Sequence, residues 1–538
     1  MEIEKLVRKN IKTLLPYSTA RDEAGKGYEV YLDANESPWN NNINRYPDPL
    51  QRELKKAISG IKNLPAEKIF VGNGSDEAID LLFRIFCQPG ADNVVAAGPS
   101  YGMYKVASGI NDIEFREVLL RSDFSLDSEA VLKAVDENTK IIFLCSPNNP
   151  SGNLLEEESV EKIAKEFKGI LVIDEAYIDF SESESYTGKL EEYPRLVVLQ
   201  TLSKAWGMAG LRVGFAFASE KIISVMTKVK YPYNIGRDTL VRVLEALTKS
   251  IDNKVEKIIR ERKRVSKLLS EIPEVEKVFP SNANFLLVKF KDCKRIYNKL
   301  LSNGIVVRDR SSLPLCKETL RITVGTPQEN DSLLRVLSGE TLPESAVRRA
   351  YLTRETSETS VILELDLDGG IGTAIRTGLP FFDHMLEQLA FHSGISINLQ
   401  AAGDIHRDEH HTVEDCAIVL GEALNKALGG KAGISRYGFT LPMDDSISSV
   451  AIDLGGRAYL RWDVRFSGNE IGGINVDMFR HFFYSLAISS KSTIHISARG
   501  DNDHHRIEAI FKAYARSLRM AVKREETGNV LPSTKGLL

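Results

Sequence analysis

Histidine is confined to one end of this sequence. All nine histidines lie between residues 384 and 505 of the 538-residue chain, and they include two copies of the pattern His-His-x-x-Glu, at residues 410–414 and 504–508. Imidazole groups bind metals and exchange protons near neutral pH, so we expect this end of the chain to carry a chemistry that the rest lacks. The length also exceeds what one ordinary hydrophobic core organises. The chain is therefore predicted to fold as at least two domains.

We place the domain boundary near residue 343. A polar stretch at residues 338–349 follows a strand-like run at 320–324 and precedes a new run of alternating apolar and polar residues at 360–368. The predicted domains are residues 1–342 and 343–538.

Charge and cysteine content exclude several classes of function. The chain has 70 basic and 74 acidic residues, a formal net charge of -4, and so offers no broad attraction for nucleic acid or an anionic membrane. Its five cysteines are scattered without a CxxC pair, which argues against a disulfide framework and favours a reducing compartment. No segment has the pattern of a signal peptide or a membrane span. These features predict a cytoplasmic protein that acts on small molecules.

The first domain alternates short apolar runs with segments of helical length, such as residues 78–86 and 156–167. Continuous apolar runs of this kind are typical of a mostly parallel sheet that is covered on both faces. Ligands of such sheets bind at the carboxyl ends of the strands. The predicted strands are residues 68–71, 93–96, 140–145, 171–174 and 196–201.

Polar residues follow three of these strands. Gly72-Asn-Gly-Ser75-Asp76 precedes a helix whose free N–H groups could bind a phosphate, Asp174 could pair with a protonated pyridine nitrogen, and Lys204 could form a Schiff base. Each feature has a plain alternative when taken alone. The glycine turn could bind nothing, Asp174 could cap a helix, and Lys204 could be a solvated surface charge.

Together these segments resemble the fold-type-I aminotransferases, and most closely the histidinol-phosphate aminotransferases, over nearly all of residues 1–340. The resemblance implies an α/β aminotransferase fold with a mostly parallel sheet, a small C-terminal α+β subdomain and pyridoxal 5'-phosphate as cofactor. The matching motifs are residues 32–38, 45–49, 146–152, 174–177 and 203–214.

The resemblance also implies roles for individual residues. Lys204 would form the Schiff base, Asp174 would pair with the pyridine nitrogen, and Tyr101 would stack on the ring. Tyr46 would reach across from a second subunit, which implies at least a dimer. Contacts to the ring hydroxyl would come from Asn148 and Tyr177, and the phosphate would be held by Ser75, Asp76, Ser203 and Arg212.

Two arginines are candidates for binding the substrates. A transaminase must accept two substrates in turn, here imidazole acetol phosphate and glutamate, and guanidinium groups bind both phosphate and carboxylate in a bidentate way. Arg321 and Arg308 fit this role. Ordinary surface ion pairing is the alternative for both.

The second domain contains a weak internal repeat. A lone histidine, His384 or His481, precedes each His-His-x-x-Glu pattern. Adjacent side chains diverge by about 100° on a helix and about 180° on a strand, so each histidine pair is predicted to serve two different metals. The nitrogen and carboxylate ligands suit manganese, iron or zinc, and ligand type alone does not decide. One such pattern could be only a polar helix face, whereas two matching copies favour a metal site.

Residues 350–538 resemble imidazoleglycerol-phosphate dehydratases throughout. The resemblance implies an internally duplicated α+β domain, similar to domain 2 of ribosomal protein S5, and a shell of 24 subunits built from trimers. The matching motifs are residues 354–359, 378–385, 408–415, 442–446, 502–509 and 533–536.

The dehydratase resemblance implies two manganese ions at each site. Glu358 and Glu508 are candidates for acid–base work, and Glu358 is preferred if Glu508 is fully engaged by metal. His406 and His495 match no ligand position and are interpreted as structural. The implied metal ligands are His384, His410, His411, Glu414, His481, His504, His505 and Glu508. The implied substrate contacts are Arg436, Arg457, Ser533 and Lys535 for the phosphate, together with His392 and Glu358.

The two resemblances imply consecutive reactions of histidine biosynthesis. Imidazole glycerol phosphate would lose water to give imidazole acetol phosphate, which would then accept an amino group from glutamate to give histidinol phosphate. Two alternatives stay open from the residues alone. The C-terminal domain could be an inactive assembly module held together by metal, and the N-terminal domain could be a pyridoxal-phosphate decarboxylase.

Overall fold

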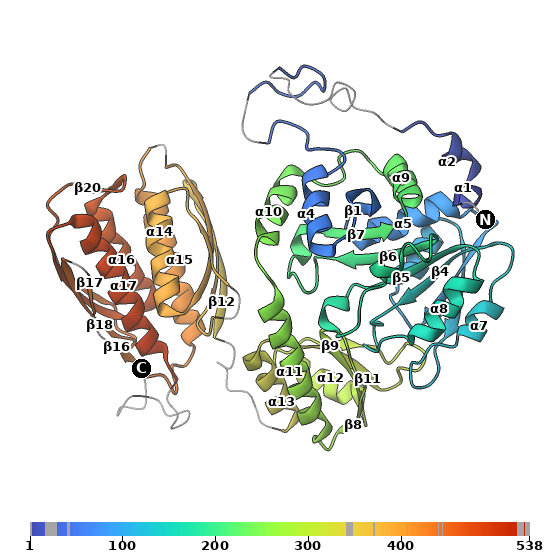
Figure 1. Ribbon diagram of the computed structural model, residues 1–538. Helices are drawn as coiled ribbons and strands as arrows, with labels where there is room; N and C mark the ends of the chain where they lie inside the picture. The colour runs from blue at the N-terminus through green and yellow to red at the C-terminus, as the bar shows by residue number, and fades with distance from the viewer. Residues whose placement is uncertain are drawn as a thin grey trace. The chain divides into compact units, whose positions relative to one another are not determined.

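The computed structural model forms two compact units, Met1–Glu340 and Thr341–Leu538 (Figure 1). It describes residues 3–16, 30–39, 43–339, 348–369, 372–405, 407–438, 441–443, 445–524 and 532. The predicted boundary at residue 343 lies outside the described residues, and so do His406, Ser533 and Lys535. Within the described residues, no helix is both long and apolar enough to cross a lipid bilayer.

A seven-stranded sheet forms the centre of the first unit, in the order β1-β7-β6-β5-β4-β2-β3. Strand β7 runs antiparallel to its neighbours β1 and β6, and the other neighbouring strands are parallel. The mostly parallel sheet predicted from the sequence is therefore confirmed. The strands are β1 (Ile69–Asn73), β2 (Asn93–Gly98), β3 (Glu114–Leu119), β4 (Thr139–Cys145), β5 (Ile170–Asp174), β6 (Leu196–Thr201) and β7 (Val213–Ala218).

Both faces of this sheet are buried, which explains why its strands read as continuous apolar runs. In β4, Ile142 and Leu144 belong to one hydrophobic cluster, whereas Ile141 and Phe143 belong to a cluster on the opposite face. Helices cover the two faces (Figure 1). The α-helices are α1 (Ile3–Leu6), α2 (Lys9–Thr13), α4 (Arg52–Lys62), α5 (Ser75–Phe86), α6 (Met103–Ile110), α7 (Ser128–Lys133), α8 (Glu157–Glu166), α9 (Glu220–Val229), α10 (Arg237–Leu247) and α11 (Asp252–Ser270).

Short 3-10 helices occupy several connections of the first unit, at η1 (Ala66–Lys68), η2 (Ile178–Phe180), η3 (Tyr186–Lys189) and η4 (Ala209–Leu211).

A small α+β subdomain follows, as predicted. Its four strands are all antiparallel, in the order β10-β11-β9-β8. The last helix begins at a capping box, in which Thr326 and Glu329 satisfy each other's backbone N–H groups. The elements are β8 (Val275–Val278), β9 (Phe285–Phe290), α12 (Cys293–Ser302), β10 (Arg308–Asp309), β11 (Thr319–Thr323) and α13 (Pro327–Leu337).

The second unit repeats one topology twice. Its first sheet has the order β12-β13-β15-β14, and its second has the order β16-β18-β22-β19, with β17 also paired to β18. In each sheet the last strand is parallel to its neighbour and the other pairs are antiparallel. The strands are β12 (Arg349–Glu355), β13 (Thr359–Asp366), β14 (Ala374–Arg376), β15 (Ser396–Gly403), β16 (Tyr437–Gly438), β17 (Leu441–Met443), β18 (Ser446–Asp453), β19 (Tyr459–Val464) and β22 (Thr493–Arg499), with a separate ribbon of β20 (Glu470–Ile471) and β21 (Ile474–Asn475).

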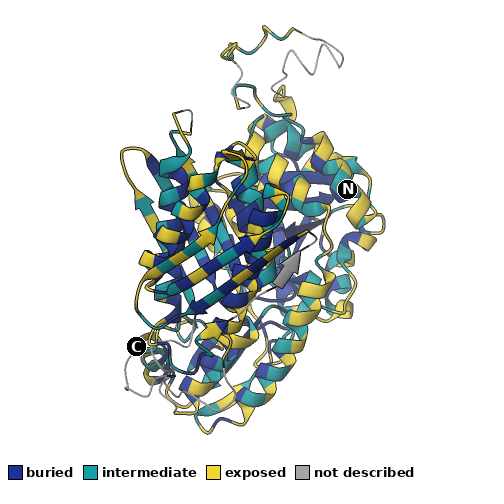
Figure 2. Ribbon diagram, turned by 90° about the vertical axis from the view of Figure 1, so that its left-hand side faces the viewer, coloured by how far each residue is buried: buried dark blue, intermediate teal, exposed yellow. Residues whose placement is uncertain are grey.

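Four helices pack between the two sheets of this unit (Figure 1). Helix α15 packs on α16, and α14 packs on α17, so helices of one repeat contact helices of the other. Buried and exposed residues alternate along β18, because one face of each sheet meets the helices (Figure 2). The helices are α14 (Pro380–Ser393), α15 (His410–Leu428), α16 (Val476–Ser490) and α17 (Asp503–Val522).

Two candidate active sites

The predicted Schiff-base residues gather at one edge of the central sheet. Asp174 is the last residue of β5, and Lys204 lies just beyond the end of the neighbouring strand β6. Ser75 is the first residue of α5, directly after β1. Because parallel strands end at the same edge, three segments that are far apart in the sequence form one site.

Asp174 is a buried carboxylate with two protein donors. Its Oδ2 accepts a hydrogen bond from the hydroxyl of Tyr104 at 2.7 Å, and its Oδ1 accepts one from the backbone N–H of Ala176 at 3.1 Å. Burial raises the pKa of Asp174, and the two hydrogen bonds act in the opposite direction. The carboxylate is thus fixed in orientation inside an apolar sheet edge.

The start of α5 forms a polar pocket with two other segments. Asp76 accepts hydrogen bonds from the Tyr101 hydroxyl at 3.0 Å and from Nη2 of Arg212 at 3.2 Å. Gly74 has a φ of 76°, and a Cβ atom there would lie 2.6 Å from Nη2 of Arg212. The glycine therefore provides both the turn and the space for the guanidinium group to approach the helix N-terminus.

Lys204 lies close to Tyr177, with its Nζ 5.6 Å from the centre of the tyrosine ring. Withdrawal of the ammonium from water and the nearby Arg321 cation lower the pKa of Lys204, and Asp174 acts against them. Tyr177 is itself buried and packs its ring against Phe285 at 5.1 Å. A lysine with a lowered pKa is more often present as a free amine, the form that attacks a carbonyl group.

Two other predicted cofactor residues are held by local hydrogen bonds. Asn148 is buried and donates from Nδ2 to the carbonyl of Pro99 and to Oγ of Ser151, at 3.1 and 2.7 Å. The hydroxyl of Ser203 accepts a hydrogen bond from Oγ1 of Thr201 at 3.0 Å. Both side chains are thereby oriented by their own loops.

Three arginines of the small subdomain lie near one another. Arg321 is half-buried and donates to Oδ1 of Asn149, and burial lowers its pKa. Arg308 lies opposite Arg321 in the register of β10 and β11 and is exposed. Burial lowers the pKa of Arg310, and the cations of Arg321 and Arg308 lower it further. Positive charge thus collects here, which suits a site for an anionic substrate.

Among the described residues, the ring of Tyr46 makes its aromatic contact with Tyr233 and not with the other predicted cofactor residues. Its ring stacks on Tyr233 at 4.4 Å, and the residue is 51% exposed. The contact of Tyr46 with the cofactor of a second subunit stays a prediction.

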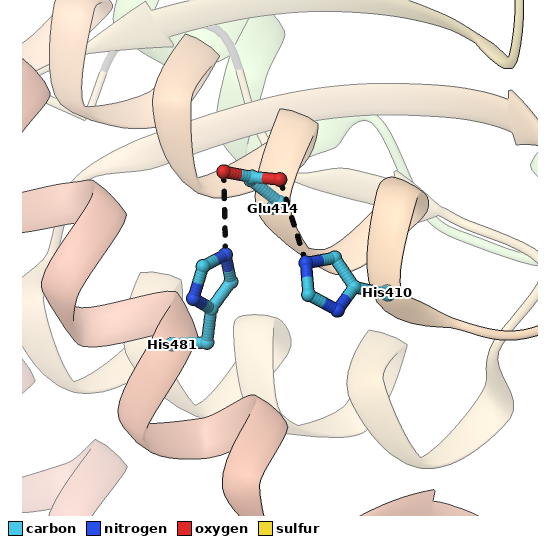
Figure 3. Close-up of side chains that lie close together, drawn as sticks. All are labelled: His410, Glu414 and His481. Carbon is cyan, nitrogen blue, oxygen red and sulfur yellow. Dashed lines mark ion pairs between the residues drawn. The ribbon is translucent and has the colours of Figure 1, made fainter.

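The second unit gathers a possible metal site at the junction of its two repeats. One ligand atom from each of His410, Glu414 and His481 lies within 4.8 Å of the others. Figure 3 shows both imidazoles directed at the carboxylate, with Nε2 of His410 at 3.6 Å and Nε2 of His481 at 3.3 Å from its oxygens. His410 and Glu414 belong to α15 of the first repeat, whereas His481 belongs to α16 of the second.

The repeat predicts a matching group on the other side. Nε2 of His504 lies 3.9 Å from Glu508 on α17. Burial acts to raise the pKa of Glu508, but Lys512, at 2.8 Å, and the nearby His384 and His504 lower it overall. His384, on α14 of the first repeat, is therefore close to the carboxylate of the second. The two lone histidines are exchanged between the repeats.

The second histidine of each pair faces different partners. The rings of His410 and His411 are 5.9 Å apart at an interplanar angle of 63°, as expected for neighbours on a helix. Nδ1 of His411 lies 3.1 Å from Asp404, and Nε2 lies 3.9 Å from Glu358.

In the second repeat, Nδ1 of His505 lies 2.6 Å from Asp445. An aspartate therefore contacts Nδ1 of the second histidine in both repeats. This contact orients the ring so that Nε2 is directed away from the aspartate.

The predicted substrate residues of this unit are spread more widely. His392 lies 3.1 Å from Gln388, and burial together with the Lys512 and Arg516 cations lowers its pKa. Arg436 makes a bidentate ion pair with Asp453, at 2.6 and 3.0 Å, and donates to the carbonyl of Pro532 at 2.9 Å. Arg457 is exposed, and its carbonyl accepts a hydrogen bond from Thr493.

His495 lies on β22, apart from the other histidines, with its ring 5.7 Å from that of Tyr459.

Sequence reasoning missed several polar residues at these sites. Tyr104 follows Tyr101 by one helical turn, and Arg310 follows Arg308 at the spacing that keeps two strand residues on one face, so spacing could have indicated both. Asp404 and Asp445 lie in segments after β15 and before β18. No pattern in a single sequence connects either aspartate with a histidine on another element.

Two family models match the chain. The model for aminotransferases of class I and II matches residues 24–337, and the model for imidazoleglycerol-phosphate dehydratase matches residues 377–518. A histidinol-phosphate aminotransferase from Parabacteroides distasonis is 54% identical over 338 residues, which cover 62% of this chain and 98% of that protein.

Solved structures agree with the fold of the first unit. The histidinol-phosphate aminotransferase from Clostridium acetobutylicum is 26% identical and has a TM-score of 0.52, with 55% of this chain and 91% of that chain covered. A structure of the Sinorhizobium meliloti histidinol-phosphate aminotransferase, in complex with pyridoxal-5'-phosphate, is 24% identical, covers 55% and 83% of the two chains and has a TM-score of 0.52. This chain belongs to the class I and II aminotransferase family and carries an imidazoleglycerol-phosphate dehydratase domain after its aminotransferase domain.

Proposed function

We propose that the two units catalyse consecutive steps of histidine biosynthesis, with residues 1–342 as the transaminase and residues 343–538 as the dehydratase. The dehydratase would convert imidazole glycerol phosphate to imidazole acetol phosphate, and the transaminase would convert that ketone to histidinol phosphate with glutamate as donor. The observation that carries the proposal is the presence, in one chain, of Lys204 near a buried Asp174 and of a His410–Glu414–His481 group. The product of the first reaction is the substrate of the second.

The residues of the first unit fit pyridoxal phosphate. The buried acid Asp174 suits the pyridine nitrogen, and Lys204 suits the aldehyde. The helix N-terminus that follows Gly74, with Arg212 beside it, suits the phosphate. Bound pyridoxal phosphate supplies an electron sink that stabilises the carbanion left when a proton leaves the amino-acid α-carbon. Ser75, Asp76, Ser203 and Arg212 would hold the phosphate, and Tyr101 and Asn148 would orient the ring.

Lys204 is positioned to move the proton in this step. Its lowered pKa favours the free amine, which can accept a proton at Nζ from one face of the substrate and return it to another atom. Tyr177 lies beside that amine. Arg321 and Arg308 would bind the carboxylate or phosphate of each substrate in turn, because no carboxylate in the described part of the chain forms an ion pair with either arginine.

The residues of the second unit fit divalent metal ions. The group formed by His410, Glu414 and His481 supplies two nitrogens and a carboxylate, a donor set that suits manganese, and His384, His504 and Glu508 supply the same types. His411 and His505 would complete the ligands. Bound metal ions supply positive charge that favours the deprotonated imidazole ring of the substrate, whose electrons can expel the hydroxyl group from the adjacent carbon of the glycerol chain.

Glu358 is our preferred residue for the proton transfer. Glu508 is engaged by Lys512 at 2.8 Å, whereas Glu358 is exposed at a turn and its carboxylate lies 3.9 Å from His411. Glu358 can therefore accept a proton at Oε2 from a substrate held near that histidine. Arg436, Arg457, Ser533, Lys535 and His392 would bind the substrate, chiefly its phosphate.

Incubation of the purified, metal-loaded protein with imidazole glycerol phosphate and glutamate tests both reactions together. Phosphorus NMR should show the ketone intermediate and then histidinol phosphate, with one 2-oxoglutarate formed per histidinol phosphate. Accumulation of the ketone alone would exclude transamination. Release of carbon dioxide would favour the decarboxylase alternative, and unchanged starting material would favour the inactive assembly module.

We also propose a cytoplasmic homo-oligomer of at least two subunits. Tyr46 is 51% exposed, so a neighbouring subunit could contact its ring, and in the second unit Glu358 and His504 are also exposed. Light scattering of the metal-loaded protein tests this, because an active monomer would exclude shared sites.

A further inference from the structure

Tyr104 lies directly behind the proposed pyridine-binding carboxylate. It is the second residue of α6, only 1% exposed, and its hydroxyl lies 2.7 Å from Oδ2 of Asp174. Its ring stacks on Phe143 of β4, with centres 4.7 Å apart and an interplanar angle of 14°. The edge of Tyr101 meets the same ring at 5.7 Å and 85°. Neighbouring aromatic groups thus hold the phenol in one orientation.

The phenol acts as the donor in this hydrogen bond. Burial, followed by the charge of Asp174, raises the pKa of Tyr104 well above its usual value, so the hydroxyl keeps its proton. Asp174 needs such donors, because it is 3% exposed and burial raises its own pKa. Asp76 opposes ionisation of Asp174, whereas the Ala176 N–H and the Lys204 cation favour it. Within the described residues, Tyr104 is the only side chain that donates a hydrogen bond to Asp174.

We propose that Tyr104 is a positioning residue of the transaminase, which holds the Asp174 carboxylate in the orientation that pairs with the protonated pyridine nitrogen of the cofactor. This inference rests on the proposed function, since it requires pyridoxal phosphate in the site. Oδ2 of Asp174 is held by Tyr104 and Oδ1 by the backbone of residue 176, so the plane of the carboxylate is fixed by two donors. Removal of the hydroxyl would leave one oxygen of the buried group without that donor.

The competing explanation is that Tyr104 only fills the core behind the sheet edge. Tyr104→Phe keeps the stacked ring and removes one oxygen atom, so packing alone predicts little change in the site. The two explanations predict different effects on the binding affinity of cofactor analogues. An effect through Asp174 requires a ring nitrogen, whereas a distorted pocket affects every analogue of the same shape.

The test compares binding of pyridoxal phosphate with binding of 1-deazapyridoxal phosphate, in which carbon replaces the ring nitrogen. Fluorescence titration of the full-length apoprotein measures both affinities. We expect Tyr104→Phe to weaken binding of pyridoxal phosphate about tenfold, the usual effect of losing a hydrogen bond to a charged group, and to change binding of the deaza analogue less than about twofold. Equal losses for both compounds, or no loss for either, would overturn the proposal.

Two further variants keep the test decisive. Tyr193→Phe removes a buried hydroxyl that has no hydrogen-bond partner in the part of the chain that the structure describes, and it should bind both compounds as the wild type does. If Tyr104→Phe does not fold, 3,5-difluorotyrosine at position 104 preserves the ring and strengthens the donor. It should tighten binding of pyridoxal phosphate alone, and a change in neither compound would contradict the proposal.

The outcome for the wild type separates this inference from the proposed function. If the wild-type protein does not bind pyridoxal phosphate, both fail. If it binds the cofactor and transaminates but Tyr104→Phe shows no selective loss, only the role of Tyr104 fails. In an Asp174→Ala background, Tyr104→Phe should have no further effect on pyridoxal phosphate binding, because the residue through which it acts is absent.

Discussion

The two candidate sites differ in how closely their polar side chains contact one another. In the first unit, Tyr104 donates a hydrogen bond to Asp174 at 2.7 Å, and Tyr101 donates one to Asp76 at 3.0 Å. In the second unit, the contacts of Glu414 and Glu508 with histidine nitrogens are longer, at 3.3–3.9 Å. The first site is held together by short hydrogen bonds, whereas the second holds its carboxylates and imidazoles farther apart.

Burial explains this difference. A buried polar group without a partner is costly, so the carboxylate at the edge of the central sheet must be satisfied by the fold itself. Histidines at the starts of α15 and α17 are half-exposed or exposed, so water can satisfy their ring nitrogens. The comparison predicts that the two sites fail independently and respond to different treatments.

The largest difference between the effects on the two activities is expected from Lys204→Ala. Transamination should fall on the order of 10³-fold or more, because the Schiff-base amine and the proton carrier are lost together. Dehydration, followed as formation of the ketone, should stay within about twofold of wild type. Lys165→Ala, at a surface lysine paired with Glu161, is the control and should change neither rate. A parallel loss of both activities would show that the two sites do not act independently.

The opposite result, a loss of dehydration without a loss of transamination, is expected from Glu414→Ala. Loss of a ligand that contacts both His410 and His481 should lower dehydration on the order of 100-fold or more and leave transamination unchanged. Removal of metal with a chelator should likewise lower dehydration and leave transamination unchanged. Glu422→Ala, at an exposed position of the same helix, is the matched control. Full dehydratase activity without metal would exclude the metal site.

A smaller effect is expected from Asp445→Ala. Loss of the carboxylate that orients His505 should weaken manganese binding about 10- to 100-fold, as measured by competition with a chelator. Asp463→Ala, on the exposed side of β19, should bind manganese normally. Asp445 also accepts hydrogen bonds from the backbone of residues 501 and 502. A variant that is less stable without metal but binds manganese with unchanged affinity would show that the role of Asp445 is purely structural.

The smallest effect concerns Glu175, the buried neighbour of Asp174. Burial raises its pKa to about 7, although Ser185, the backbone of Tyr186 and Gln200 donate hydrogen bonds that oppose the shift. Between pH 4.5 and 7 the folded state keeps a proton that the unfolded state has lost, so the free energy of unfolding should fall as pH rises and then level off.

Glu175→Gln removes this titration. The Tm of the variant relative to wild type should therefore rise by a few degrees between pH 5 and pH 7.5, with transamination retained. Calorimetry of the transition of the first unit across this range measures the difference. A Tm difference that does not depend on pH would show that Glu175 is ionised in the folded protein over the whole range.

The sequence predicted the fold of the first unit because its strands are buried on both faces. The runs at 140–145, 171–174 and 196–201 coincide closely with β4, β5 and β6. Strands β3 and β7 were not predicted. Strand β3 lies at the edge of the sheet and its residues are mostly exposed or half-buried, whereas β7 is fully buried but half of its residues are glycine or alanine and only one is β-branched. An edge strand of that composition lacks the continuous apolar pattern on which the other predictions rested.

Site residues were predictable where a motif contains them and not where the fold brings distant segments together. The two His-His-x-x-Glu patterns mark most histidines of the metal group, and the duplication pairs each lone histidine with a pattern. Sequence alone associated His384 with the pattern that follows it, whereas the packing of α15 on α16 places His481 with Glu414. Partners such as Tyr104 and Asp445 depend on side-chain directions that only tertiary structure defines.

The exchange of lone histidines between the repeats bears on how the second unit arose. Each lone histidine acts on the glutamate of the other repeat: Nε2 of His481 lies 3.3 Å from Glu414, and the charge of His384 lowers the pKa of Glu508. A half-length ancestor with one copy of the pattern would have had to pair with an identical chain, and each partner would have given its histidine to the other. Gene duplication would then have joined two chains whose shared metal sites already existed. Joining the two repeats would have required no new metal ligands.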